Sequence, residues 1–310
     1  MADNSQGTRD AGIKRYIRRI RAWISRPKII FQDRLIRVDD HSYCDNPIFI
    51  IGIHRSGTSL LRRVINSHPN IACPAESFFM QHYVAMLGDQ LVQDGYVGFG
   101  NDREMMRVDL ARKASSLHEA NRLANGKTRW ADKTPQYTAI LPGLLNLFGP
   151  KTSFVMIYRH PFDVMESIKQ RRWDLAGKGQ FDFNATLNHV REQYDKQLAF
   201  EAKHSEKCVR VSYEDLTETP EPTLRKLMAG IGEDFDPKQL VHHHGNHGFG
   251  TEDPIARGLT GFQPSLGNWW TWDDETYSAA CASLGEICTQ LGYSTVRNEL
   301  RVDTIPEEVA

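Results

Sequence analysis

Residues 47–69 read PIFIIGIHRSGTSLLRRVINSHP, and this stretch decides the fold. The run from Ile48 to Ile53 is short, apolar and β-branched, which is typical of a parallel strand buried on both faces. The small residues of RSGTS then predict a tight loop. The apolar residues that follow recur at helical spacing and predict a helix: Leu60, Leu61, Val64 and Ile65. The order is therefore strand, tight loop, helix.

Two more units of the same order follow, at 153–172 and 207–231. In each, an apolar strand (SFVMIY, then KCVRVSY) precedes a helix with proline near its beginning. Strands that alternate with helices predict an α/β fold, here a P-loop-type parallel sheet flanked by helices. Residues 78–128 and 173–205 read as mainly helical, so we expect a single domain with helical insertions.

The composition of the 310 residues is that of an ordinary globular protein, with 40% hydrophobic and 25% charged residues. The formal net charge of −1 argues against a protein that binds nucleic acid through bulk positive charge. The five cysteines are scattered, which argues against a disulfide framework or a zinc cage and suits a reducing compartment. We therefore expect a cytoplasmic protein without a secretory signal or a membrane-spanning segment.

The domain is expected over 47–296, between an N-terminal segment, 1–46, and a C-terminal tail, 297–310. Residues 13–28 carry isoleucines at spacings of four, three and four among seven Lys and Arg, which predicts a basic amphipathic helix. Such a helix packs on the domain or on a partner subunit, for example in a dimer. Alternatively, it lies on anionic lipid and makes a peripheral contact with the inner face of a membrane.

The loop after the first strand has the features of an anion site. Gly52 and Gly57 are separated by four residues, as in the phosphate-binding loop of NTPases, where backbone N–H groups and a helix N-terminus point at an anion. The lysine that an NTPase places after the second glycine is absent, since Thr58 and Ser59 stand there. The cation, Arg55, comes before that glycine instead. Such a loop can bind phosphate or sulfate without indicating ATP hydrolysis.

A second anion-binding pattern follows the strand at 153–158. Arg159 ends this strand, Ser167 lies eight residues on in the next helix, and Arg171 follows one turn later. Arginine can grip a phosphate group with two hydrogen bonds, and serine adds a hydroxyl. Ligand sites of parallel sheets lie at the carboxyl ends of the strands. We therefore expect one ligand that carries two separated phosphate-type groups.

Three segments together resemble those of the sulfotransferase family. Residues 52–69 look like its 5′-phosphosulfate loop, residues 158–167 (YRHPFDVMES) look like its 3′-phosphate motif, and Tyr213 with Glu-Asp-Leu matches a segment whose tyrosine lies by the cofactor. The resemblance runs from about residue 47 to 295 and is greatest to tyrosylprotein sulfotransferases and their bacterial relatives. It implies the cofactor 3′-phosphoadenosine 5′-phosphosulfate, the product adenosine 3′,5′-bisphosphate, and no metal.

The resemblance also implies roles for individual residues. Glu76, in CPAESFF, is expected to be the general base, Lys133, in WADKTP, to contact the leaving oxygen, and Arg55 to assist as a third catalytic residue. His54 and His68 are rival bases by their chemistry. The expected cofactor-binding residues are Arg55, Ser56, Gly57, Thr58, Ser59, Arg159, Ser167, Arg171, Tyr213, Ser265, Gly267 and Asn268. Asn268 stands where the family commonly has a cation, and Arg257 is a candidate to replace that cation.

The function implied is in-line transfer of a sulfuryl group to a hydroxyl or amine of an acceptor. The sequence leaves the acceptor open among small molecules, glycans and lipids, and it gives no sign of a nucleic-acid partner. Two alternatives remain. One is a P-loop kinase or NTPase-like enzyme, which the missing lysine disfavours. The other is a non-catalytic protein that binds a membrane surface through residues 13–28, which the presence of Glu76 and Lys133 beside both phosphate motifs disfavours.

Overall fold

The computed structural model describes residues 43–175, 177–245, 247, 258 and 260–301. The amphipathic helix predicted at 13–28 and Arg257 lie outside these residues. All the described residues belong to one compact unit, Val38–Ala310. Among them, none of the helices combines the length and the apolar character that a membrane span needs.

Five parallel strands form one sheet in the order β2-β3-β1-β4-β5. The strands are β1 (Ile48–Ile51), β2 (Ile71–Ala72), β3 (Arg129–Lys133), β4 (Ser153–Tyr158) and β5 (Cys208–Ser212). The α/β class and the parallel sheet predicted from the sequence are confirmed. The strands β2 and β3 were not predicted, because β2 has only two residues and RWADK in β3 is mostly polar. The pairs Ile48↔Ser153 and Ile51↔Met156 align β1 with β4, so the loops after both strands begin at the same edge.

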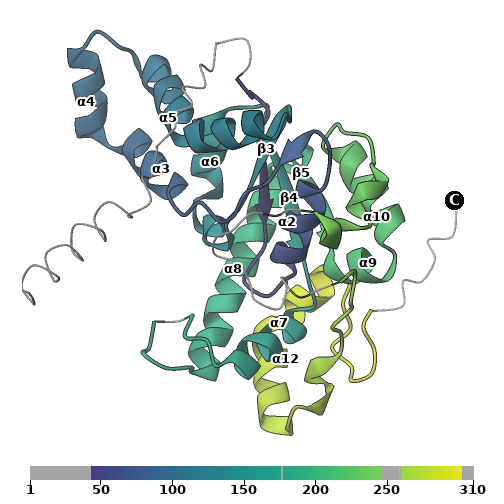
Figure 1. Cartoon of the computed structure of the whole chain (residues 1–310). Coiled ribbons are helices and arrows are strands. Elements are labelled where there is room, and N and C mark those ends of the chain that lie inside the picture. The colour runs from purple at the N-terminus through teal and green to yellow at the C-terminus, as the bar shows by residue number, and fades with distance from the viewer. Residues whose placement is uncertain (1–42, 176, 246, 248–257, 259, 302–310) are drawn as a thin grey trace, which may run out of the picture. The chain divides into compact units, whose positions relative to one another are not determined.

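Helices cover both faces of the sheet (Figure 1). One face is covered by α2 (Thr58–Asn66), α9 (Tyr213–Glu218) and α10 (Pro220–Gly230). The helices that pack on the other core are α3 (Met80–Gly88), α5 (Arg103–Ala124), α6 (Leu141–Phe148), α7 (Pro161–Arg171), α8 (Phe183–Lys203) and α12 (Asp274–Gln290), and α4 (Gln90–Gly98) packs beside α5. The short 3₁₀ turns are η1 (Pro135–Ile140), η2 (Ser205–Lys207), η3 (Pro237–Gln239), η4 (His242–His244) and η5 (Asn268–Thr271).

The alternation of side chains along β1 divides the core in two. Ile48 and Ile50 point into the core under α2 and α10, whereas Phe49 and Ile51 point into the core under the helices of the opposite face. All four side chains are almost fully buried. A strand with two buried faces needs an apolar residue at every position, which is why this stretch reads as a continuous apolar run rather than an alternating one.

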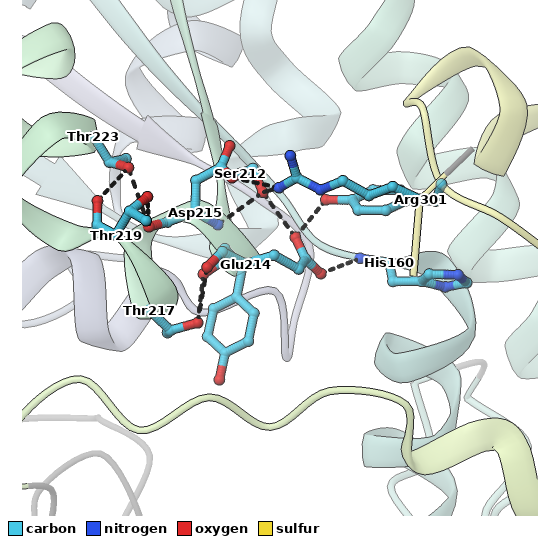
Figure 2. Close-up of polar contacts among 10 residues, drawn as sticks. His160, Ser212, Glu214, Asp215, Thr217, Thr219, Thr223 and Arg301 are labelled. Carbon is cyan, nitrogen blue, oxygen red and sulfur yellow. Dashed lines mark hydrogen bonds and ion pairs between the residues drawn. The ribbon is translucent and has the colours of Figure 1, made fainter. Parts of the chain in front are cut away.

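A buried glutamate ties the end of β4 to the end of β5 (Figure 2). The Glu214 carboxylate accepts hydrogen bonds from the His160 main-chain N–H at 2.9 Å and from the Ser212 hydroxyl at 2.9 Å. It also accepts one from the Tyr293 hydroxyl at 2.5 Å. Three partners compensate the burial of one negative charge, so this carboxylate fixes the turn in which Arg159 lies.

The imidazole of His160 caps α7 from inside the core. Its Nδ1 accepts the Phe162 N–H at 3.2 Å, and its Nε2 donates to the Ser294 carbonyl oxygen at 2.8 Å. These bonds assign the proton to Nε2. Burial lowers the pKa of His160 to about 4, so the ring is neutral at neutral pH.

The lowered pKa of His160 predicts a loss of stability on mild acidification. The unfolded chain takes up this proton near pH 6.5 and the folded chain only near pH 4, so the neutral ring stabilises the fold fully above pH 6.5, and this stabilisation is lost as the pH falls towards 4. Between pH 7.5 and 5 this one group should lower the free energy of unfolding by about 2 kcal/mol. His160→Asn keeps an acceptor for the Phe162 N–H and should remove that part of the pH dependence.

Urea denaturation at pH 7.5 and pH 5 measures the effect, with His82→Asn, at an exposed position of α3, as the control. A His160→Asn protein that loses as much stability on acidification as the unaltered protein would contradict the assignment.

Candidate functional site

The loop between β1 and α2 is closed by hydrogen bonds of its own. The Ser56 N–H and the Ser56 hydroxyl both donate to the Ile53 carbonyl oxygen, at 3.2 and 2.8 Å. Ser56 is fully buried, and its side chain shapes the turn. Gly57 precedes the first turn of α2 and supplies no side-chain cap. The first N–H groups of a helix without such a cap form an anion-binding site.

Gly57 is required at its position for two reasons. Its φ of +94° lies in the region that favours glycine. A Cβ atom there would also lie 2.4 Å from Cδ2 of Tyr213, which is too close for any real contact. The ring of Tyr213 therefore packs directly against the backbone of the loop.

Three arginines line a cavity of about 300 Å³ at the carboxyl edge of the sheet: Arg55, Arg159 and Arg171. The hydroxyl side chains of Thr58, Ser59, Ser167, Tyr213 and Ser265 lie in the same wall. No acidic residue is found among the described residues that line it. A cavity with three positive charges, several hydroxyls and a helix N-terminus suits a polyanion. Nowhere in the described part of the chain do three or more His, Cys, Asp or Glu side chains form a group that could hold a metal ion.

The two predicted anion-binding patterns meet in this cavity. The Arg55 Nε donates to the Ser167 hydroxyl oxygen at 2.9 Å, and the Arg159 Nη1 donates to the Arg55 carbonyl oxygen at 2.9 Å. The Arg159 guanidinium also donates to the Ser265 carbonyl oxygen and lies 4.6 Å from the centre of the Tyr213 ring. Arg159 thus connects the loops after β1 and β4 with the segment around Ser265.

Gly267 and Asn268, which the sequence predicted as cofactor-binding residues, bond to a buried carboxylate, and the Asn268 amide also donates to the Ser265 hydroxyl at 3.1 Å. Asp163 accepts the Gly267 N–H at 2.9 Å, the Asn268 N–H at 2.8 Å and the Asn268 side-chain amide at 3.3 Å. Burial raises the pKa of Asp163, while the charge of Arg159 and these hydrogen bonds oppose the rise. Sequence analysis did not single out Asp163, whose partners lie about a hundred residues away along the chain.

The predicted base and the predicted lysine form an ion pair beside the cavity. The Lys133 ammonium at the end of β3 is fully buried and pairs with the Glu76 carboxylate, whose side chain is 11% exposed. The same ammonium donates to the Ser59 hydroxyl at 3.4 Å. Because Ser59 lines the cavity, the pair lies next to its wall. A buried lysine without a counter-ion is costly, and Glu76 supplies the opposite charge beside it.

The two histidines considered as rival bases have different surroundings. Burial, followed by the charges of His189, Lys133 and Arg55, lowers the pKa of His54 to about 4. Proton uptake by His54 would add a charge beside existing cations, which disfavours it as a base. His68 lies beyond the other end of α2, where its Nε2 donates to the Asp234 carbonyl oxygen at 2.8 Å and its Nδ1 accepts the Asn70 N–H at 3.2 Å. Both of its nitrogens therefore serve the turn.

The chain is similar to proteins of one family. The model of the sulfotransferase family matches residues 47–237. The nodulation protein NoeE of Sinorhizobium fredii is 26% identical over 219 residues, which cover 62% of this chain and 51% of that protein. Protein-tyrosine sulfotransferase 2 of Gallus gallus is 26% identical over 211 residues, which cover 63% of this chain and 53% of that protein. The chain thus spans about half the length of these curated relatives.

A solved structure shares the fold. The sulfotransferase domain from the curacin biosynthetic pathway superposes with a TM-score of 0.58 at 21% identity. The superposition covers 80% of this chain and 97% of that domain. At this level of identity the likeness concerns the fold alone.

Because a Cβ atom at position 57 would overlap Tyr213, Gly57→Ala should lower the free energy of unfolding by more than backbone strain alone. Gly126→Ala is the matched control, because Gly126 also has a positive φ, of +65°, but a Cβ there meets nothing within 4 Å. Strain alone should cost Gly126→Ala about 1–2 kcal/mol of unfolding free energy. Gly57→Ala should cost about 1–3 kcal/mol more through overpacking and should also lose affinity for pyrophosphate.

Urea denaturation and calorimetric titration with pyrophosphate measure the two effects. Equal losses of stability in both variants, with pyrophosphate affinity intact in Gly57→Ala, would show that the Tyr213 contact does not constrain the loop.

Proposed function

Because this chain belongs to the sulfotransferase family, we propose that it transfers a sulfuryl group from 3′-phosphoadenosine 5′-phosphosulfate to a hydroxyl or amine of an acceptor. The observation that carries this proposal is the cavity in which Arg55, Arg159 and Arg171 converge from two neighbouring strand ends. This arrangement suits a ligand with two separated anionic groups. The sulfotransferase domain proposed here is the segment 47–296.

The residues around the cavity fit such a donor in two groups. The N–H groups at the start of α2, with Arg55, Thr58 and Ser59, are proposed to hold the 5′-phosphosulfate. Arg159, Ser167 and Arg171, which line the same cavity, are proposed to hold the 3′-phosphate. The donor, when bound, supplies the sulfuryl group. Ser56, Gly267 and Asn268 are proposed to shape these loops rather than to touch the donor, because Ser56 bonds within its own turn and Gly267 and Asn268 bond to Asp163.

Glu76 and Lys133 are proposed to divide the chemistry between them. Glu76 takes the proton from the acceptor hydroxyl or amine, and Lys133 stabilises negative charge that develops on the leaving oxygen. Ser59 supports this role of Lys133, since it joins the ammonium to the wall of the cavity. Arg55 contributes a second positive charge next to the same wall.

The P-loop kinase or NTPase remains the alternative enzyme, and ligand preference separates the two. Thr58 follows Gly57 where such an enzyme needs lysine. We expect calorimetric titration to show binding of adenosine 3′,5′-bisphosphate without a metal ion, and much weaker binding of ATP with Mg²⁺. The reverse preference would overturn the proposed function.

The acceptor group is proposed to be a hydroxyl or an amine. Several relatives bear the name protein-tyrosine sulfotransferase, which favours a tyrosine hydroxyl as one candidate, beside the small molecules, glycans and lipids that the sequence leaves open. A cytoplasmic location, a dimer and a peripheral membrane contact through residues 13–28 stay predictions of the sequence.

Arg171 tests the proposed 3′-phosphate group. Arg171→Met removes the charge and keeps an apolar stem over Trp173, whose ring centre lies 5.6 Å from the guanidinium carbon. The affinity for adenosine 3′,5′-bisphosphate should fall about 10- to 100-fold, as expected for loss of a charged hydrogen bond. The affinity for adenosine 5′-phosphosulfate, which lacks the 3′-phosphate, should change little. Ser167→Ala should also weaken the binding of adenosine 3′,5′-bisphosphate more than that of adenosine 5′-phosphosulfate, but by a smaller factor.

Arg172→Met is the matched control, since Arg172 is exposed and does not line the cavity. If Arg171→Met weakens both ligands equally, or neither, the 3′-phosphate does not lie against this arginine.

Glu76→Gln tests the proposed base. The amide keeps the shape of the side chain and can still accept from Lys133, but it cannot take up a proton. Turnover should fall about 10²- to 10⁴-fold, the usual scale for loss of a general base, while the affinity for adenosine 3′,5′-bisphosphate stays nearly unchanged. A more acidic acceptor should restore part of the turnover, because its proton leaves more easily.

Steady-state kinetics with acceptors of graded acidity measure the effect, and Glu218→Gln, at an exposed position of α9, is the control. Near-normal turnover of Glu76→Gln would assign the base to another residue, with His54 as the next candidate.

A further inference from the structure

A chain of hydrogen bonds lies behind Glu76 and restrains the backbone that carries it. The N–H of Ser77, the next residue, donates to the Thr134 hydroxyl oxygen at 3.1 Å. The Thr134 hydroxyl in turn donates to the Asp132 carboxylate at 2.8 Å. Thr134 and Asp132 are buried, at 0% and 1% exposure, so water does not compete for these bonds.

Asp132 is itself held from the side of α5. Its second carboxylate oxygen lies 2.8 Å from Nε2 of His118, and both side chains are buried. The His118 ring packs on Trp130 with 4.7 Å between the ring centres. The carboxylate that orients Thr134 is therefore also in contact with α5, through His118.

Tyr137 forms a second anchor on the same segment. Its hydroxyl lies 2.6 Å from the Ser77 hydroxyl and accepts the Met80 N–H at 3.0 Å. This bond replaces a cap for α3, because the side chain of Phe79 supplies none. Burial, and then the charge of Asp132, raise the pKa of Tyr137 to about 12, so the hydroxyl keeps its proton.

The segment between the two anchors is strained. Phe78 has a φ of +58°, a conformation that is rare for a bulky residue. Such a conformation persists only where the surrounding contacts over-determine it, and these conformations concentrate at functional sites. Here the Thr134 and Tyr137 hydroxyls restrain the residues on both sides of Phe78.

We propose that Thr134, backed by Asp132, is a positioning residue that holds the Glu76 carboxylate in the direction needed for proton transfer. The inference rests on the proposed role of Glu76 as the base. Two consecutive residues at the end of β3 restrain Glu76. Lys133 pairs with the carboxylate itself, and Thr134 holds the amide that follows it.

Thr134→Val tests the proposal because it removes the hydroxyl at nearly constant shape. Turnover should fall about 10- to 100-fold, as expected when a catalytic group is displaced slightly, with the KM for 3′-phosphoadenosine 5′-phosphosulfate unchanged. Thr134→Ser, which restores the hydroxyl, should recover most of the turnover. Thr138→Val is the matched control: Thr138 is equally buried, but its hydroxyl donates at 3.0 Å to the Pro135 carbonyl oxygen within η1.

The double variant separates positioning from a general loss of structure. If Thr134 acts through Glu76, then Thr134→Val should cost almost nothing further in the Glu76→Gln background. Two results would overturn the positioning role and leave the proposed function intact. One is that Thr134→Val turns over as fast as Thr138→Val. The other is that Thr134→Val lowers turnover by the same factor in the unaltered protein and in the Glu76→Gln background. Normal turnover of the single variant Glu76→Gln would instead show that Glu76 is not the base, so the positioning role would fall while the proposed transfer reaction could still stand.

Tyr137→Phe covers the case in which circular dichroism shows that Thr134→Val does not fold. It removes the second anchor and should lower turnover in the same manner, again without a further effect in the Glu76→Gln background. Unchanged turnover of Tyr137→Phe would then count against the positioning of Glu76 by this network.

Discussion

The hydrogen bond from the Arg159 guanidinium to the Arg55 carbonyl oxygen is the interaction on which the site depends. Arg55 has a φ of +72°, which is unfavourable for a residue with a side chain. The bond from Arg159 holds the carbonyl of Arg55, and Ser167 accepts from its Nε. These restraints on Arg55 exist because β1 and β4 are neighbours in register, so that the loop after one strand begins beside the loop after the other.

The electrostatics of the site follow from this convergence. Three arginines around a cavity without acidic neighbours among its described lining residues repel one another, and a bound polyanion relieves that repulsion. Lys133 is kept out of this group by its ion pair with Glu76, although Ser59 brings it next to the cavity wall. The arginine-lined cavity and the Glu76–Lys133 ion pair therefore lie next to each other at the same edge of the sheet.

The sequence was sufficient to predict those strands and loops that a local pattern of residues specifies. Apolar runs predicted β1, β4 and β5, and glycine and arginine spacing predicted the loops that the structure brings together. The strand β3 was not predicted, because it is mostly polar and its side chains are buried only by contacts with distant parts of the chain. Asp163, which organises Gly267 and Asn268, has partners about a hundred residues away, and Thr134 meets Ser77 across 57 residues. No periodicity reports such contacts, since they arise only when the sheet has formed. Ser56 is a different case: it matches a phosphate-binding motif, but its side chain bonds within its own turn, and a motif match does not distinguish these two roles.

The proposal that two strand-end loops form one donor site is tested most directly by product analysis. The protein would be incubated with 3′-phosphoadenosine 5′-phosphosulfate, a metal chelator and a panel of acceptors that includes a tyrosine peptide, glycans and simple phenols. Mass spectrometry should find a sulfated acceptor together with an equal amount of adenosine 3′,5′-bisphosphate. Failure to bind or consume this donor, combined with hydrolysis of ATP when Mg²⁺ is supplied, would contradict the proposal.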